Sequence, residues 1–298
     1  MQRRKFIRHT SLSLAGMALI NNTALAALLK DPAWKIRMLT DDTGIFTEKG
    51  GTILFHLSKE GIVVVDSQFP DSSAHLIEAL KEKTSNPYRL LVNTHHHGDH
   101  TSGNIAYKGL VKHVLAHENS KANQQRVARE QKKEENQLYP DITYTTSWCE
   151  KTANENICLH YFGAGHTNGD SLVHFQESNI VHLGDLVFNR RHPYIDKTSG
   201  ASIVNWIKVL EKAISFFDKK TQFICGHAGS GFDVILSGTD LRQFADYLGN
   251  LLKLVADELK AGKKLEEILK LKEIPGSPEW TGEGIDRPLK AAFQELAT

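Results

Sequence analysis

The sequence predicts an α/β fold in which two β-sheets pack together and helices cover their outer faces. Three observations predict it. Short apolar runs rich in Val and Ile alternate with longer amphipathic segments through the first 238 residues. Histidine and aspartate gather at the ends of the apolar runs, where strands stop and loops begin. Beyond Gly238 the pattern becomes charged and helical. This combination is typical of one large domain with a C-terminal helical extension.

The first half of the domain is expected to contain four strands and two helices. The strands are expected at Thr52–His56, Ile62–Asp66, Tyr88–Asn93 and His113–Ala116, the first two paired with each other. The helices are expected at Ser72–Lys83, which is amphipathic, and from about Asn119 to Gln137, which is polar. The strand at Tyr88–Asn93 leads directly into a loop rich in histidine.

The second half repeats this alternation. Its strands are expected at Ile157–Phe162, Leu172–Phe175, Ile180–Leu183 and Gln222–Cys225, and its helix at Ile203–Phe217. The extension is expected to form helices at Asp240–Ala261 and Leu265–Leu271, followed by a short terminal helix. These helices either cover a cleft or pack on the far side of the domain, and the sequence leaves both arrangements open.

The loop after Tyr88–Asn93 contains the pattern His-x-His-x-Asp-His, formed by His95, His97, Asp99 and His100. So many imidazoles and carboxylates in one tight turn offer little packing, and the imidazoles repel each other when protonated. A divalent metal relieves this problem, because neutral imidazole and carboxylate suit Zn²⁺. A solvent-facing turn that merely happens to be rich in histidine is the alternative. We expect a metal site here.

Three further ligand-type residues follow small residues later in the chain. They are His166 after Gly165, Asp185 after Gly184 and His227 after Gly226. Each stands near the end of an apolar run, where the last side chain of a strand can point into a cleft. Four such clusters in one chain strengthen the expectation of a shared metal site.

Together these motifs resemble the metallo-β-lactamase superfamily over roughly residues 44–230. The resemblance implies a four-layer αβ/βα sandwich over residues 27–238, with residues 239–298 as a helical extension packed on the same domain. It also implies a site for two Zn²⁺ ions. The first metal would be held by His95, His97 and His166, and the second by Asp99, His100 and His227, while Asp185 would bridge both.

This ligand set implies a hydrolase that uses a hydroxide held between two metals. The bond cleaved would belong to an ester, thioester, lactone or amide, with a β-lactam among the candidates, and Asp99 would orient the hydroxide or carry its proton. The best-known zinc β-lactamases place Cys where this chain has Asp185 and Lys where it has Phe188. The set is more similar to that of glyoxalase-type thioesterases and lactonases. Residues 184–196 resemble exported members that accompany sulfur-oxidation or quinoprotein systems.

Two other classes of function stay open. Related folds bind a single iron and oxidise persulfides, although Asp99, His100 and His227 would then be surplus. The chain could also be a non-catalytic exported accessory protein that binds a metal or a thiol partner, against which the complete ligand set argues.

Several residues near these motifs carry separate expectations. His96 lies between two ligand positions, so its side chain should point outward, away from theirs. Asp66 either orients a ligand histidine or caps the end of its strand. Asp170 either orients a ligand histidine in the same way or is a turn residue, and the turn is favoured. Arg190 or Arg191 either binds a substrate carboxylate or forms a solvated surface pair.

The first 26 residues are typical of a bacterial export leader. Arg3 and Arg4 precede a short apolar stretch and an Ala-x-Ala site after Ala26, which resembles the twin-arginine type. We expect cleavage near Ala26, a periplasmic protein and no permanent membrane span, with an uncleaved anchor as the alternative. Removal of the leader changes the formal charge from +1 to −3, because it contains Arg3, Arg4, Lys5 and Arg8 and no acid. An acidic surface argues for a small-molecule substrate and against nucleic acid.

The three cysteines are too few for a disulfide framework. Cys149 and Cys158 lie symmetrically about Ala153-Asn154, so a hairpin there would bring them opposite each other. Ala-Asn is a poor two-residue turn, and the pairing is left open. Cys225 is expected to be a buried thiol rather than a ligand.

Overall fold

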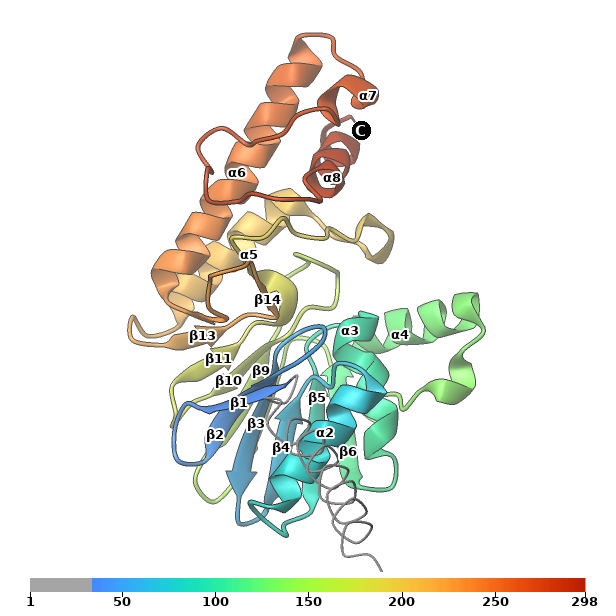
Figure 1. The fold of residues 1–298 in the computed structure, drawn as a ribbon, viewed down its shortest axis with the longest axis vertical. Helices are drawn as coiled ribbons and strands as arrows, with labels where there is room; N and C mark the ends of the chain where they lie inside the picture. The colour runs from blue at the N-terminus through green and yellow to red at the C-terminus, as the bar shows by residue number, and fades with distance from the viewer. Residues whose placement is uncertain (1–33, 298) are drawn as a thin grey trace, which may run out of the picture. The chain divides into compact units, whose positions relative to one another are not determined.

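The computed structural model describes residues 34–297, and the predicted leader lies outside the described residues. The chain divides into two units between Lys35 and Ile36. The fold and the site below concern the second unit (Figure 1). None of the helices in the described part of the chain is both long and apolar enough to span a membrane.

The first sheet is mixed and follows the order of the chain. Its strands are β1 (Lys35–Met38), β2 (Thr43–Thr47), β3 (Ile53–Ser58), β4 (Gly61–Val65), β5 (Tyr88–Asn93), β6 (Val111–His117) and β7 (Ile142–Tyr144). Strands β2, β3 and β4 pair antiparallel, whereas β4 to β7 run parallel. The carboxyl ends of the parallel strands therefore meet at one edge, and the histidine-rich loop follows β5 at that edge.

The second sheet pairs its strands in the order β15-β13-β11-β10-β9-β8. These strands are β8 (Ser147–Lys151), β9 (Asn156–His160), β10 (Leu172–Phe175), β11 (Ile180–His182), β13 (Gln222–Ile224) and β15 (Ile235–Leu236). A small third sheet joins β12 (Phe188–Asn189) to β14 (His227–Ala228). Strands β11 and β13 are parallel, and helix α5 (Ile203–Phe216) lies between them in the chain.

The helices lie beside the two sheets, and those near the C-terminus extend away from them (Figure 1). The α-helices are α2 (Pro70–Lys81), α3 (Gly98–Thr101), α4 (Glu118–Gln131), α5 (Ile203–Phe216), α6 (Gly238–Lys260), α7 (Leu265–Ile268) and α8 (Asp286–Leu296). Short 3-10 helices are η1 (Ser102–Tyr107), η2 (Glu134–Asn136), η3 (Gly184–Leu186) and η4 (Lys197–Ser199). The side chains of Ser202 and Ser237 cap α5 and α6 at their first turns.

One hydrophobic core lies between the sheets. Val63 and Val65 of β4 enter this core, whereas Val64 points to the opposite face, as the two-residue period of a strand requires. From the second sheet, Val173 and Phe175 of β10 enter the same core. This confirms the prediction of two sheets packed face to face.

A second core joins the other face of the second sheet to the helices. Phe223 of β13 packs there with Trp206 of α5, Phe244 of α6 and Leu289 of α8, all of them buried. Each such side chain stabilises the fold by about 2 kcal/mol through burial. The C-terminal helices therefore pack on the same domain as α5. Whether they also reach the cleft is shown by the residues that line it, described below.

The structure departs from the predicted elements where the sequence pattern is short or polar. Strands β1, β2, β7, β8, β12, β14 and β15 were not predicted. The helix expected to reach Gln137 ends at Gln131, because Lys132 adopts a left-handed conformation with φ of 55°. The other predicted strands and helices are present with shifts of a few residues at their ends.

Cys149 and Cys158 form a disulfide between β8 and β9, and they occupy opposite positions in the register of that hairpin. The prediction that a hairpin would align them is confirmed. The objection from the Ala-Asn turn does not apply, because a four-residue loop, Thr152–Glu155, joins the strands. Within that loop the Thr152 amide donates to the Glu155 carbonyl at 2.7 Å. Cys225 is a buried free thiol, as predicted.

Candidate metal centre

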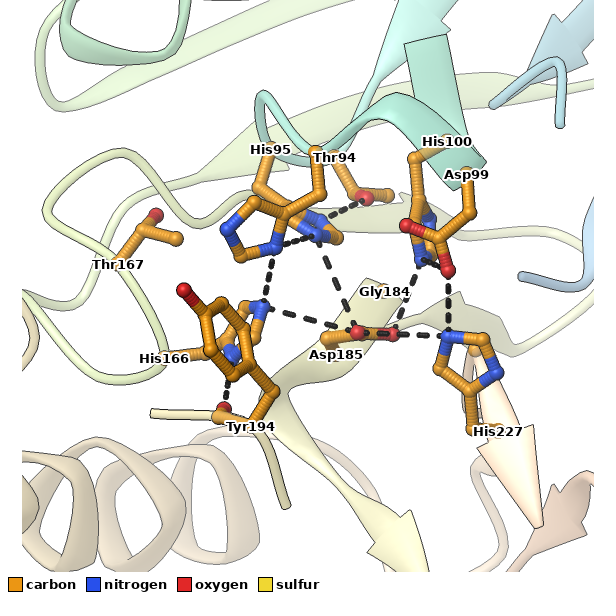
Figure 2. Close-up of polar contacts among 12 residues, drawn as sticks. Thr94, His95, Asp99, His100, His166, Thr167, Gly184, Asp185, Tyr194 and His227 are labelled. Atoms are coloured by element: carbon orange, nitrogen blue, oxygen red, sulfur yellow. Dashed lines mark hydrogen bonds and ion pairs between the residues drawn. The ribbon is translucent and has the colours of Figure 1, made fainter. Parts of the chain in front are cut away.

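The seven ligand-type side chains singled out in the sequence meet at one place (Figure 2). Loops and short elements at the ends of β5, β11 and β13 supply most of them, and the loop before β10 supplies His166. The side chains form two groups. The first consists of His95, His97, His166 and Asp185, and the second of Asp99, His100 and His227. In each group the candidate donor atoms lie within 4.8 Å of one another.

In the first group, three imidazole nitrogens converge. Nδ1 of His97 lies 3.1 Å from Nε2 of His95 and 2.8 Å from Nε2 of His166. The nearer carboxylate oxygen of Asp185 lies 4.0 Å from Nε2 of His95 and 3.6 Å from Nε2 of His166. Two nitrogens bound to one tetrahedral Zn²⁺ are separated by roughly 3.3 Å, since each Zn–N bond is about 2.0 Å. The observed separations are on this scale.

Outer hydrogen bonds decide which nitrogen of each ring carries the proton. Nδ1 of His166 lies 2.8 Å from the Tyr194 carbonyl oxygen, which can only accept, so Nδ1 donates. Nε2 of His97 lies 3.1 Å from an Asp196 carboxylate oxygen and donates to it. Nδ1 of His95 lies 3.1 Å from the Thr94 hydroxyl, whose own proton is donated to Asp66.

In the neutral form of each of these rings, the proton therefore lies on the outside and the lone pair points inward. Lone pairs that face each other at about 3 Å repel unless a cation or a proton lies between them. Burial, with the neighbouring histidines, lowers the pKa of His95 well below its ordinary value and that of His166 to about 3. A proton is thus disfavoured on these two rings, and the arrangement fits a metal cation.

The candidate donor atoms of the second group also lie close to one another. Nδ1 of His100 donates to Asp66 at 2.8 Å, so Nε2 of the neutral ring presents a lone pair to the centre. That Nε2 lies 3.1 Å from Oδ1 of Asp185, and among the described residues neither atom has a hydrogen-bond partner. Nε2 of His227 lies 3.0 Å from Asp99 and 3.5 Å from Asp185. Buried polar atoms without partners are costly, and a cation bound by both would satisfy them.

Asp185 lies between the two groups and faces both (Figure 2). Its side chain is only 5% exposed. Burial would raise its pKa, but the surrounding imidazoles of His227 and His100 outweigh burial and lower it. Burial also lowers the pKa of His100, yet the carboxylates of Asp185 and Asp66 raise it well above the ordinary value. The charge of these carboxylates thus favours a positive charge at this position, which a bound metal cation would supply.

Asp66 answers one of the questions left open by the sequence. It has a left-handed backbone with φ of 65° directly after β4, and it is fully buried. Its carboxylate accepts hydrogen bonds from the Thr94 amide, the Thr94 hydroxyl and Nδ1 of His100, at 2.7–2.8 Å. Asp66 thus orients His100 directly and His95 through Thr94, which is more than a strand cap does. Asp170 accepts from the amide and hydroxyl of Thr167 and is a turn residue, as predicted.

His96 belongs to neither group of candidate ligands around Asp185, as predicted. The expectation that its side chain faces outward is wrong. It is 4% exposed, and its Nε2 lies 3.1 Å from the Ser199 hydroxyl and 3.4 Å from Asp196. Asp196 was not recognised in the sequence. It contacts both His96 and His97, and these three residues form a further cluster of metal-ligand type. Asp196 also accepts from the amides of Thr198 and Ser199, as the Asp of a turn does. The sequence Asp-Lys-Thr-Ser could have indicated this turn, but not the contact with His97.

Two glycines lie against the centre where no other residue fits. A Cβ added to Gly226 would lie 2.1 Å from Oδ1 of Asp185, and one added to Gly51 would lie 2.2 Å from the His100 ring. Real Cβ atoms do not approach other atoms so closely. The backbone therefore packs directly on these two side chains and fixes their positions.

A cleft of about 530 Å³ opens over the centre. Its lining includes His97, Asp99, Asp185 and His227 together with Arg191 and Arg287. A volume in this range suits a small molecule. The loop before α8 and the first turn of α8 contribute Glu283, Gly284 and Arg287. The C-terminal extension therefore reaches the cleft as well as packing on α5.

The donor set of imidazole and carboxylate, the converging lone pairs and the orphaned atoms fit a divalent metal such as Zn²⁺. The fold and these donors define the class of protein: a two-sheet α/β protein with metal-binding groups at its strand ends. Known proteins narrow this class. The model of the metallo-beta-lactamase superfamily matches residues 50–227, more than half of the chain. The chain belongs to this superfamily and is a metal-dependent hydrolase.

Among solved structures, a metallo-beta-lactamase from Pontibacter korlensis is similar, with a TM-score of 0.62. It is 20% identical in sequence, and the match covers 73% of this chain and 99% of that one. At this identity the likeness concerns the fold. None of the curated proteins matches the chain.

Proposed function

We propose that the protein is a periplasmic hydrolase that binds two Zn²⁺ ions and cleaves an ester, thioester, lactone or amide bond by means of a bridging hydroxide. One observation carries the proposal: two groups of donors converge on opposite sides of the single carboxylate of Asp185. His95, His97 and His166 would hold one ion. Asp99, His100 and His227 would hold the other, and Asp185 would contact both. In an enzyme with a single iron ion, Asp99, His100 and His227 would have no metal to bind.

Zinc supplies Lewis acidity, and it lowers the pKa of a coordinated water to about 7. The protein's own residues supply position. Asp66, Thr94, Asp196 and the Tyr194 carbonyl hold the outward nitrogens, so the inward nitrogens are aimed at the centre. Because these hydrogen bonds are made within the protein, they limit how far the donors must move during the reaction.

Asp99 is the candidate for proton handling. Its side chain is 32% exposed, more than that of any other of the seven candidate ligands, and it lines the cleft. Burial would raise its pKa, but the hydrogen bond with His227 and the charge of His100 lower it to about 2. Asp99 is therefore ionised at neutral pH and accepts hydrogen bonds. A carboxylate in this position orients a water or receives its proton during attack on an acyl carbon.

The substrate and the compartment follow from other features. A cleft of about 530 Å³ favours a small molecule, and the acidic charge of the chain without its leader argues against nucleic acid. The arginine-containing leader that ends near Ala26 supports twin-arginine export to the periplasm. Folded-state export is consistent with a protein that acquires its metals before translocation.

A substrate panel tests this function. Metal-replete protein is assayed with esters, thioesters, lactones and a chromogenic cephalosporin, beside the Asp185→Asn variant. We expect turnover of at least one class, abolished by a chelator and reduced at least a hundredfold in the variant. Asp141→Asn is the matched control, because that exposed Asp also pairs with a histidine but lies outside the centre. Chelator-resistant turnover, or equal turnover in Asp185→Asn, would reject the proposal.

A further inference from the structure

Two arginines in the cleft have no partner of opposite charge among the described residues. Arg191 and Arg287 both line the cleft and are exposed. Within residues 34–297, neither forms an ion pair. Nη1 of Arg191 lies 3.5 Å from Nδ1 of His227, whose Nε2 faces the metal centre. The guanidinium of Arg191 is therefore separated from the proposed metal position by a single imidazole ring.

The neighbouring arginine, Arg190, has a structural role instead. The side chain of Arg190 is 8% exposed and pairs with Asp240 at 2.9 Å and Glu279 at 3.2 Å. It also lies over the rings of Phe232 and Trp280. Its backbone has φ of 51°, so the chain turns sharply between the two arginines and sends their side chains apart. One arginine fastens α6 to the domain, and the other remains available to a ligand.

Arg287 is held in place by the helix that carries it. On α8, Leu289 and Ala292 are buried in the second core. Glu295 of α8 accepts hydrogen bonds from the first amides of α5, those of Ile203 and Val204, at 2.8 and 2.9 Å. The backbone of Arg287 is thus fixed relative to the domain, although its side chain is free to reach into the cleft. The residue lies outside the segment matched by the superfamily model, so it is a feature of this chain's extension.

The charges of the cleft wall favour a single negative charge on the ligand. Two guanidinium groups are opposed by one further carboxylate in the wall, that of Glu283, which forms no ion pair with either arginine. Asp99 and Asp185 belong to the proposed metal centre and are balanced there. Apart from the centre, one positive charge remains, which matches a monoanion. Guanidinium groups bind a carboxylate through paired hydrogen bonds.

We propose that Arg191 and Arg287 bind a carboxylate of the substrate, so the preferred substrates are acyl compounds that carry a carboxylate apart from the bond that is cleaved. This inference rests on the proposed hydrolase function. Arg191 would hold the carboxylate on the His227 side of the centre, and Arg287 would close over it from the extension. The pair selects the substrate, while the residues of the centre act on the acyl group.

Two matched chromogenic esters test the proposal in the metal-loaded protein. The mono-4-nitrophenyl ester of glutaric acid carries a free carboxylate, and its methyl ester does not. We expect kcat/KM for the anionic ester to fall about tenfold in Arg191→Gln or Arg287→Gln and about a hundredfold in the double variant. The neutral ester should change less than about twofold. Arg242 of α6 is half-exposed, pairs with Glu211 of α5 and is not part of the cleft lining. Arg242→Gln therefore removes the same charge elsewhere and should change neither rate.

Calorimetric titration with monomethyl glutarate, and with dimethyl glutarate as its neutral counterpart, separates this inference from the hydrolase function. Arginine-dependent binding of the monoanion without hydrolysis of any ester supports the carboxylate site and rejects the proposed function. Hydrolysis of both esters with no effect of the arginine variants rejects the carboxylate site alone. Binding of the monoanion that does not depend on the arginines also overturns it. Tighter, equally arginine-dependent binding of methyl phosphate would overturn carboxylate as the ligand class.

Discussion

The substitution Asp66→Asn tests how the centre is held together without changing a proposed ligand. Asparagine tolerates the left-handed backbone at this position and has nearly the same volume. It replaces one carboxylate oxygen with an amide group, and that group donates where Asp66 accepts from Nδ1 of His100 at 2.8 Å. The proton of His100 would then move to Nε2, which can donate to Oδ1 of Asp185 at 3.1 Å. The nitrogen needed for a metal would be occupied.

The magnitude follows from these contacts. Loss of an outer partner of a ligand histidine typically weakens metal binding 10–100-fold, or about 1.4–2.7 kcal/mol. The effect should fall on the group of Asp99, His100 and His227. The other group contacts Asp66 only through Thr94, so its affinity should change by less than about threefold.

The assay is a competition titration of metal-free protein with zinc against a chromophoric chelator, fitted to two sites. Asp141→Asn serves as the control, because its carboxylate also lies 2.7 Å from a histidine nitrogen, that of His113, and 2.6 Å from a backbone amide, but far from the centre. Binding of both zinc equivalents to the folded Asp66→Asn protein as tightly as to the parent would show that Asp66 does not orient His100 for the metal.

Three further changes give separable results. Asp196→Asn removes the acceptor of Nε2 of His97, so zinc affinity of the group with His95 and His166 should fall 10–100-fold in the same titration. Gly226→Ala places a methyl group 2.1 Å from Oδ1 of Asp185; we expect loss of both zinc equivalents by elemental analysis, and full occupancy would show that the packing is looser than described. Glu295→Gln should lower the free energy of unfolding by about 1–3 kcal/mol at pH 7 in denaturant titrations. Burial would raise the pKa of Glu295, but the Ile203 amide and other donors lower it below 4.5, so its contribution is present above pH 4.5 and lost as pH falls through the lowered pKa. A difference that does not shrink in acid would contradict this assignment.

The proposed ligands could be read from the sequence because each follows a strong local signal. His95 and His97 follow the buried strand β5, and Asp185 follows β11, so an apolar run in the sequence indicates each position. Parallel strands bring their carboxyl ends to one edge, which explains why distant segments of the chain meet. The two-sheet fold was predictable for the same reason, since Val63 and Val65 alternate with Val64 between the two faces of β4.

The residues that contact these proposed ligands could not be predicted from the sequence in the same way. Asp196 contacts His97, 99 positions earlier in the chain, and it follows no apolar strand. Arg191 and Arg190 are indistinguishable in sequence, and only the left-handed turn at Arg190 and its ion pairs separate their roles. Strands β14 and β15 have two residues each, too few to show any period. Such features depend on tertiary contacts rather than on local pattern.

The central claim is that two cations share the carboxylate of Asp185. Elemental analysis of the protein purified without added metal tests it most directly, with the Asp185→Asn variant prepared in parallel. We expect about two zinc atoms per chain in the parent and fewer than one in the variant. One iron atom per chain, or an unchanged zinc content in Asp185→Asn, would contradict the account.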